Sequence, residues 1–136
     1  MSDGYEPLVR FLRKTIEANA DFCISFYEYM KFCLYHAEHG YYMRRKQKIG
    51  KAGDFYTSAS VGTVMGKMLA RFIARKASGL TPGRFRVVEW GGGDGTLALH
   101  ILNELMENFP IEYEAMEWVA IEASSYHERL QMERLH

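Results

Sequence analysis

The sequence has little of what marks secreted, membrane-spanning or nucleic-acid-binding proteins. Two cysteines in 136 residues are too few for a disulfide framework. The 17 lysines and arginines balance 17 aspartates and glutamates, and a net charge of zero removes the broad attraction that non-specific nucleic-acid binding needs. The longest stretch without one of these charged residues, residues 55–66, is shorter than the about 20 residues that span a membrane.

The N-terminus also lacks a targeting signal. Its first six residues include an aspartate and a glutamate and have no apolar core, so they do not form a secretory signal peptide. We therefore expect a cytoplasmic protein with no membrane span. The composition, 48% hydrophobic and 25% charged, is that of an ordinary globular domain, which excludes a disordered or fibrous chain.

The first half of the chain is predicted to be helical. Residues 8–20 carry apolar side chains at intervals of four, which indicates an amphipathic helix. Ser25 and Glu28 have the spacing of a capping box, which predicts the start of a second helix. A third helix is predicted from three sets of residues. They are an apolar stripe (Val61, Val64, Met65, Met68, Leu69, Phe72, Ile73), a small-residue stripe for close approach (Gly62, Gly66, Ala70, Ala74) and a solvated face (Lys67, Arg71, Arg75).

The second half changes from helices to an α/β pattern. Residues 85–90 are β-branched and bounded by glycines, which is typical of a strand, and residues 118–121 are a second strand candidate. The glycines at 91–95 lead into an apolar helix that Pro110 closes. Residues 125–128 form another capping box and predict a last helix. Strand, glycine turn, helix, strand and helix are the start of a parallel α/β unit.

The glycine run is the main functional signal. A strand that ends in glycines and passes directly into a helix brings free N–H groups and the positive end of the helix dipole to one point. The dinucleotide pattern fails from Gly91, because it meets Thr96 where glycine or alanine is needed, and a later frame ending at Ala98 starts too far from the strand. The pattern acidic-x-Gly-x-Gly-x-Gly fits without a shift, and S-adenosylmethionine enzymes use that pattern. The candidate cofactor-binding residues are Glu89, Gly91, Gly92, Gly93, Gly95 and Thr96.

Glu122 is a further candidate for the same site. It directly follows the second predicted strand, one helix and a loop after the glycines. A carboxylate at this place can accept hydrogen bonds from both ribose hydroxyls. A solvated strand end is the alternative interpretation, but the glycine pattern favours ribose binding.

Four motifs occur in one order along the chain. They are residues 24–30 (ISFYEYM), residues 33–36 with 40–42 (CLYH and GYY), residues 53–58 (GDFYTS) and residues 89–97 (EWGGGDGTL). With these motifs the sequence resembles the MidA-like S-adenosylmethionine-dependent methyltransferases, the family of a mitochondrial complex I assembly factor that methylates arginine. The sequence departs from the family pattern in two places. Ala59-Ser60 replaces a usual Pro-Glu, so any role of that Glu has no counterpart here, and Gly92 replaces a usual proline, which only loosens the loop.

The resemblance implies a fold, a cofactor and a substrate class. The fold is α/β, with N-terminal helices followed by the first β-α-β-α portion of a class I (Rossmann-like) methyltransferase. The cofactor is S-adenosyl-L-methionine, and the substrate is a protein side chain such as arginine. Asp54, Thr57 and Ser58 are implied to lie beside the cofactor and substrate cleft. Asp54 is the candidate catalytic carboxylate, because a nucleophilic guanidinium or amine must be kept neutral.

The same resemblance divides the chain into two regions. Residues 1–83 are a helical cap with the cleft segment, and residues 84–136 are the start of the Rossmann-like S-adenosylmethionine-binding domain. The class I sheet has more strands than the two predicted here, so we expect the N-terminal part of a longer protein. The uncovered edge of strand 85–90 then predicts a homodimer through that edge.

Two alternative functions remain open. A non-catalytic module that binds S-adenosylmethionine or a partner protein is the main one, and a nicotinamide oxidoreductase is a more distant one. Cys23, Cys33, His36 and His39 are zinc-ligand types, but their spacing matches no familiar zinc module, and we expect no metal. The basic residues within 44–51 are interpreted as a solvated loop rather than a nucleic-acid site.

Overall fold

The computed structural model describes residues 5–45, 53–54, 57, 62–80 and 83–135. The chain folds as two compact units, Met1–Lys46 and Gln47–His136. The predicted division between residues 83 and 84 separates a cap from a binding domain by function, and it stays a prediction. None of the helices in the described ranges is long and apolar enough to cross a membrane.

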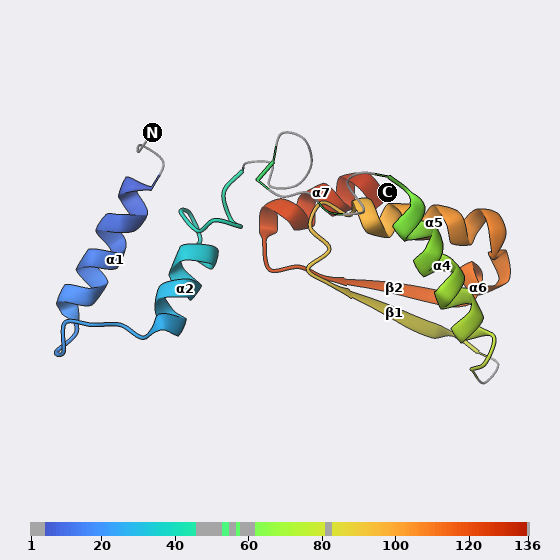
Figure 1. Cartoon of the computed structure of the whole chain (residues 1–136), viewed down its shortest axis with the longest axis horizontal. Coiled ribbons are helices and arrows are strands. Elements are labelled where there is room, and N and C mark those ends of the chain that lie inside the picture. The colour runs from blue at the N-terminus through green and yellow to red at the C-terminus, as the bar shows by residue number, and fades with distance from the viewer. Residues whose placement is uncertain (1–4, 46–52, 55–56, 58–61, 81–82, 136) are drawn as a thin grey trace. The chain divides into compact units, whose positions relative to one another are not determined.

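The first unit is a pair of helices, α1 (Glu6–Ala18) and α2 (Phe26–Tyr35), as predicted (Figure 1). The capping box is present at the start of α2: Ser25 Oγ accepts from the Glu28 amide at 3.2 Å, and the Glu28 carboxylate accepts from the Ser25 amide at 3.0 Å. The ring of Phe11 on α1 meets the ring of Phe32 on α2 edge to face, with centroids 4.9 Å apart. This aromatic contact helps to join the two helices.

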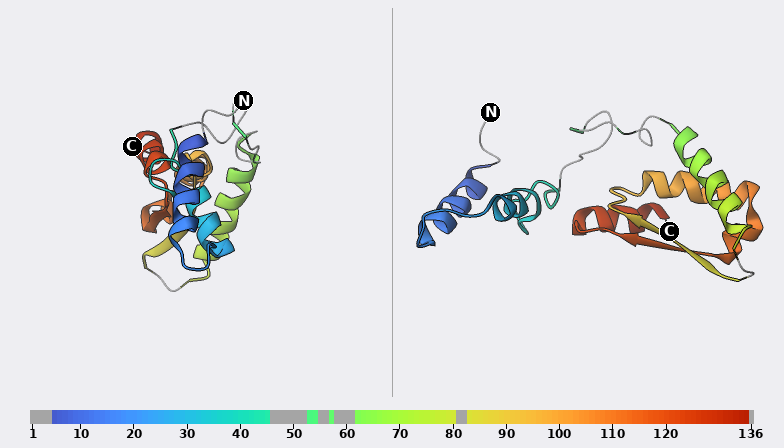
Figure 2. Two further views of the ribbon diagram at one scale, coloured as in Figure 1. Left: turned by 90° about the vertical axis from the view of Figure 1, so that its left-hand side faces the viewer. Right: turned by 60° about the horizontal axis from the view of Figure 1, so that its bottom comes forward.

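The second unit is built on a two-stranded parallel sheet of β1 (Phe85–Trp90) and β2 (Met116–Ile121). β1 has the predicted bounds, and β2 begins two residues before the predicted start. The strands pair in register from their first to their last residues, so their carboxyl ends lie side by side. Helices α4 (Val64–Ala77) and α5 (Thr96–Asn108) cover one face of this sheet (Figures 1 and 2).

The core of this unit lies where α4 packs against α5. Its buried residues are Ala70, Ala74, Ile101 and Leu105. Gly66 belongs to the same contact, because a Cβ atom at this position would collide with His100 of α5. The close approach predicted for the small-residue stripe is therefore confirmed for Gly66, Ala70 and Ala74. It is wrong for Gly62, which precedes α4 and where a Cβ atom would have no described atom within 4 Å.

The large apolar residues of α4 only partly face this core. Leu69 and Ile73 pack against it. Val64, Met65, Met68 and Phe72 are exposed, Met68 to 65%. The helix begins at Val64, three residues after the predicted start, and Val61 lies outside the described residues. Helix α4 meets α5 through its smallest residues, because these let the two backbones approach most closely, and most of its bulkier apolar residues then face away from the contact.

A buried charge also joins α4 to α5. The carboxylate of Glu104 on α5 is buried, and it accepts from Arg71 at 3.4 Å and lies 3.9 Å from the Lys67 ammonium. Both cations are more than half exposed, as their predicted place on a solvated face requires. They also neutralise a carboxylate that would otherwise be costly to bury.

Two helix boundaries differ from the prediction. Pro110 does not simply close α5, since it begins the short helix α6 (Pro110–Ala115), where proline suits the first turn. Helix α7 (Ser125–Leu135) is present, but the capping hydroxyl is that of Ser124, which accepts from the His127 amide at 3.4 Å. The predicted capping box at residues 125–128 is wrong: the capping serine is one residue earlier, and the residue three positions after it is His127 rather than the glutamate or glutamine of a capping box.

The other face of the sheet has no helix over it within the described ranges (Figure 2). Val88 and Trp90 of β1 lie on this face and are 49% and 80% exposed. Arg86 and Glu117 lie beside each other on the same face and form an ion pair at 2.8 Å. Parallel sheets are normally covered on both faces, so this surface is unusually apolar for one that meets water.

Candidate functional site

The glycine loop begins where β1 ends. Gly91, Gly93 and Gly95 have φ angles of +68°, +59° and +78°, in the left-handed region that side chains other than glycine rarely adopt. The Gly91 amide donates to the Ile121 carbonyl at 2.8 Å and so extends the pairing of β1 with β2 by one step. The alternation of the glycines therefore has a backbone cause, since every second residue of the loop has a positive φ angle.

The loop leads directly into the N-terminus of α5. Gly95 precedes the helix and has no side chain to cap it. Asp94 supplies the cap instead, because its Oδ1 accepts from the Thr96 amide at 3.1 Å and from the Thr96 hydroxyl at 2.8 Å. The hydroxyl of the predicted cofactor residue Thr96 is therefore engaged within the protein.

The carboxyl group of Glu89 lies against the loop beside Gly92. Its Oε2 is buried and has no hydrogen-bond partner among the described residues. A Cβ atom on Gly92 would collide with this oxygen, so glycine at that position makes room for the carboxylate. Burial raises the pKa of the Glu89 carboxyl, and the negative charge of Glu122 raises it further.

Glu122 reaches the same loop from the end of β2. Its Oε2 accepts from the Gly93 amide at 3.2 Å, and its Oε1 accepts from the Ser124 amide at 2.9 Å. It also lines a cavity of about 430 Å³, a volume within the range of small-molecule sites. The cavity lining is Leu102, Trp118, Ala120, Glu122, Glu128, Gln131, Met132 and Leu135.

The structure thus brings together the predicted cofactor residues of β1, the loop and β2. Their role in binding a cofactor stays a prediction, as does the role of the predicted cleft residues. Asp54 and Thr57 are exposed, and Ser58 lies outside the described residues.

Three residues around the loop were not predicted from the sequence: Asp94, Gln131 and Arg134. Gln131 donates to the Gly93 carbonyl at 2.8 Å, and Arg134 pairs with Asp94 at 3.0 Å. Asp94 could have been found, since it stands inside the glycine run. Gln131 and Arg134 carry no such signal, because only the folding of α7 beside the loop brings them near it.

The zinc-ligand types in the first unit form no metal centre in the described part of the chain, where no three His, Cys, Asp or Glu residues are grouped for metal binding. His36 Nδ1 instead accepts from the amides of Glu38 and His39, both at 3.3 Å. This ring nitrogen therefore accepts hydrogen bonds from the turn that follows α2.

Residues 68–136 match a protein family described as "putative S-adenosyl-L-methionine-dependent methyltransferase". The protein arginine methyltransferase NDUFAF7, mitochondrial, of Mus musculus is 34% identical over 103 residues, which are 74% of this chain and 23% of that protein. The NDUFAF7 homolog, mitochondrial, of Drosophila melanogaster is 32% identical over 103 residues, 75% of this chain and 23% of that protein. The chain thus spans about a quarter of the length of these relatives.

A solved structure gives the same result for the fold. It is a Burkholderia thailandensis protein described as a "likely methyl transferase" and bound to S-adenosyl-homocysteine. The TM-score is 0.79 at 33% identity, covering 97% of this chain and 34% of the other. The predicted α/β class and the predicted start of a methyltransferase fold are confirmed by this likeness.

Proposed function

This chain belongs to the S-adenosyl-L-methionine-dependent methyltransferase family that its sequence resembles, and we propose that its glycine loop binds S-adenosylmethionine. The observation that carries the proposal is the meeting of Glu89, the left-handed glycines and Glu122 at the carboxyl ends of two parallel strands. Such strand ends are where open α/β sheets bind ligands. Methyl transfer to a protein side chain such as arginine is proposed for the complete fold, and this chain spans about a quarter of the length of the relatives described above.

The residues around the loop fit this cofactor. The unpartnered Oε2 of Glu89 is a buried acceptor beside Gly92 of the loop, and the ammonium group of a methionine moiety is a donor of opposite charge. Glu122 uses one oxygen for the Gly93 amide and the other for the Ser124 amide. A carboxylate has about four acceptor positions, so two remain for the hydroxyls of a ribose.

Methyl transfer requires little of the protein beyond binding and orienting the cofactor and the methyl acceptor. The cofactor supplies a methyl group already activated on a sulfonium sulfur. The chain has to hold the cofactor and align the acceptor in line with the methyl group. We propose that Asp54 lies near the acceptor and keeps a guanidinium or amine neutral by accepting its proton. Asp54→Asn in a complete protein should then lower turnover and leave cofactor affinity unchanged, and intact turnover would contradict this role.

Titration calorimetry on this chain tests the binding proposal. S-adenosylhomocysteine should bind, NAD should not, and Glu122→Gln should weaken S-adenosylhomocysteine binding about tenfold through the loss of charge-assisted hydrogen bonds. Glu117→Gln is the matched control, because Glu117 is exposed on the same strand and pairs with Arg86 on the far face. Absence of S-adenosylhomocysteine binding, or equal binding of NAD, would overturn the proposal.

A non-catalytic binding module is the second candidate, and the two-stranded sheet of this chain favours it. Turnover separates the two candidates. Transfer of a labelled methyl group to an arginine-containing protein supports the enzyme, and cofactor binding without transfer by this chain and by a longer version supports the module.

We also propose self-association through β1. The exposed Val88 and Trp90 support it, as does the second edge of β1, which pairs with no strand among the residues that the structure describes, because an uncovered edge can pair with another chain. Sedimentation of this chain should give a dimer, and Val88→Lys should shift it toward the monomer. A strict monomer at high concentration would contradict the proposal. The cytoplasmic location stays a prediction from the sequence; the two relatives described above are named as mitochondrial.

A further inference from the structure

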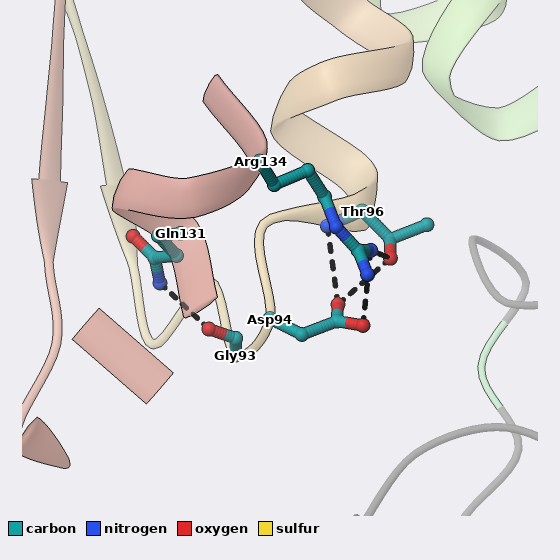
Figure 3. A network of polar contacts seen from close by, with 5 residues as sticks. All are labelled: Gly93, Asp94, Thr96, Gln131 and Arg134. Carbon is teal, nitrogen blue, oxygen red and sulfur yellow. Dashed lines mark hydrogen bonds and ion pairs between the residues drawn. The ribbon is translucent and has the colours of Figure 1, made fainter. Parts of the chain in front are cut away.

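Helix α7 contacts the glycine loop through a buried amide (Figure 3). The side chain of Gln131 is 5% exposed, and its Nε2 donates to the Gly93 carbonyl at 2.8 Å. Its Cγ atom lies beside Gly95, since a Cβ atom on Gly95 would be only 3.2 Å from it. Gln131 therefore contacts two of the three left-handed glycines.

Arg134, one turn further along α7, holds the next part of the loop (Figure 3). Its guanidinium pairs with Asp94 Oδ2 at 3.0 Å and donates to the hydroxyl of Thr96. The other oxygen of Asp94 caps the first amide of α5. A continuous set of polar contacts thus runs from α7 through Asp94 to the helix N-terminus that faces the loop.

The peptide groups around Gly93 are held from two sides. The Gly93 amide donates to Glu122, and the Gly93 carbonyl accepts from Gln131. Both partners follow β2 in the chain, so residues about 30 to 40 positions away set the conformation of the loop. A loop with glycines at alternate positions has a large conformational entropy when it is free. Contacts that order it in advance remove that cost from ligand binding.

We propose that Gln131 and Arg134 are positioning residues that hold the glycine loop in its binding conformation, so that α7 sets the affinity of the loop for its cofactor. The ligand in this inference rests on the proposed function, whereas the hold on the loop does not. Neither side chain needs to touch the cofactor. Both act through the loop, Gln131 on the Gly93 carbonyl and Arg134 on Asp94.

Amide hydrogen exchange measured on the whole chain without any ligand tests whether α7 orders the glycine loop. Arg134→Gln should speed exchange of the amides of residues 93–96 about fivefold to tenfold relative to wild type, with the middle of α5 unchanged. Arg129→Gln is the matched control, since Arg129 is an exposed arginine on the same helix. Arg134→Lys should recover part of the protection, because lysine keeps the charge facing Asp94. Arg134 is partly exposed, so its variants should fold even if Gln131→Leu does not.

Titration with S-adenosylhomocysteine tests the consequence for binding. Arg134→Gln should bind about fivefold to tenfold more weakly than Arg129→Gln, and the double variant with Asp94→Asn should lose little more than either single variant, because both remove one interaction. Loop exchange in Arg134→Gln equal to that in the control would overturn the inference, as would unchanged affinity. Failure of the wild type to bind S-adenosylhomocysteine would overturn the proposed function instead, and the exchange result would still decide whether α7 holds the loop.

Discussion

Replacing Glu89 by glutamine should make the protein more stable and a poorer binder of its cofactor. Glu89 Oε2 is buried and has no hydrogen-bond partner among the described residues, and the Glu122 carboxylate lies close enough to raise its pKa. Glutamine still places a polar group at this position but removes the negative charge, and an unsatisfied buried charge costs more than the about 1–3 kcal/mol of an unsatisfied neutral group. Since Glu89 is only partly buried, we take the lower end, about 1 kcal/mol, or about 3–5 °C in the melting temperature of a domain of this size.

The pH dependence gives the sharper test. The pKa of Glu89 is raised in the folded protein above its ordinary value of 4.5. Protonation therefore favours folding: the contribution of Glu89 to stability is fully present below pH 4.5 and is lost as the pH rises through the folded-state pKa. The increase in the free energy of unfolding of Glu89→Gln over wild type should be largest at neutral pH and should shrink toward zero near pH 4.

Thermal melts of Glu89→Gln and wild type between about pH 4 and pH 8 measure this difference. Glu117→Gln is the control with the opposite sign, since Glu117 is exposed and paired, and its loss should cost at most about 1 kcal/mol. S-adenosylhomocysteine affinity of Glu89→Gln should fall about tenfold, because the ammonium group loses a charged acceptor. A less stable Glu89→Gln at pH 7, or a difference that does not change with pH, would refute the reasoning.

Three further predictions concern the contact of α4 with α5, each checked by thermal or denaturant unfolding. Gly66→Ala should cost about 1–3 kcal/mol because its Cβ would collide with α5, whereas Gly62→Ala, with open space around it, should change little. Leu105→Ala should cost about 2–5 kcal/mol, since this side chain is fully buried, and the exposed Met106 is the control. Glu104→Gln should cost about 1–3 kcal/mol by leaving the two cations of α4 without their carboxylate; equal stability would mean that these ion pairs contribute nothing.

Local patterns in the sequence were enough to predict the elements of the fold. The capping box at Ser25 and Glu28 is made of contacts three residues apart, and the strand at residues 85–90 needs only β-branched residues between glycines. The alternation of Gly91, Gly93 and Gly95 was likewise visible, because a positive φ is a property of a single residue. The family resemblance rests on motifs of this local kind.

The face that each helix presents was decided by packing. The sequence of α4 offers two stripes, and only the partner helix shows that Ala70 and Ala74 are buried while Met68 is exposed. Periodicity reveals that a helix has an apolar stripe and not which neighbour will cover it.

The candidate site shows the same division. Glu89, the glycines and Glu122 could be named from the sequence, because each stands at the end of a predicted strand. That Glu89 lacks a partner and that Glu122 already binds the loop depend on where the two strand ends meet. Gln131 and Arg134 lie 38 residues from their partners Gly93 and Thr96, on a helix whose sequence gives no sign of a contact with the loop. The sequence alone determined which residues can form the loop, and the tertiary structure decided what holds it, because hydrogen bonds between distant segments exist only once the chain has folded.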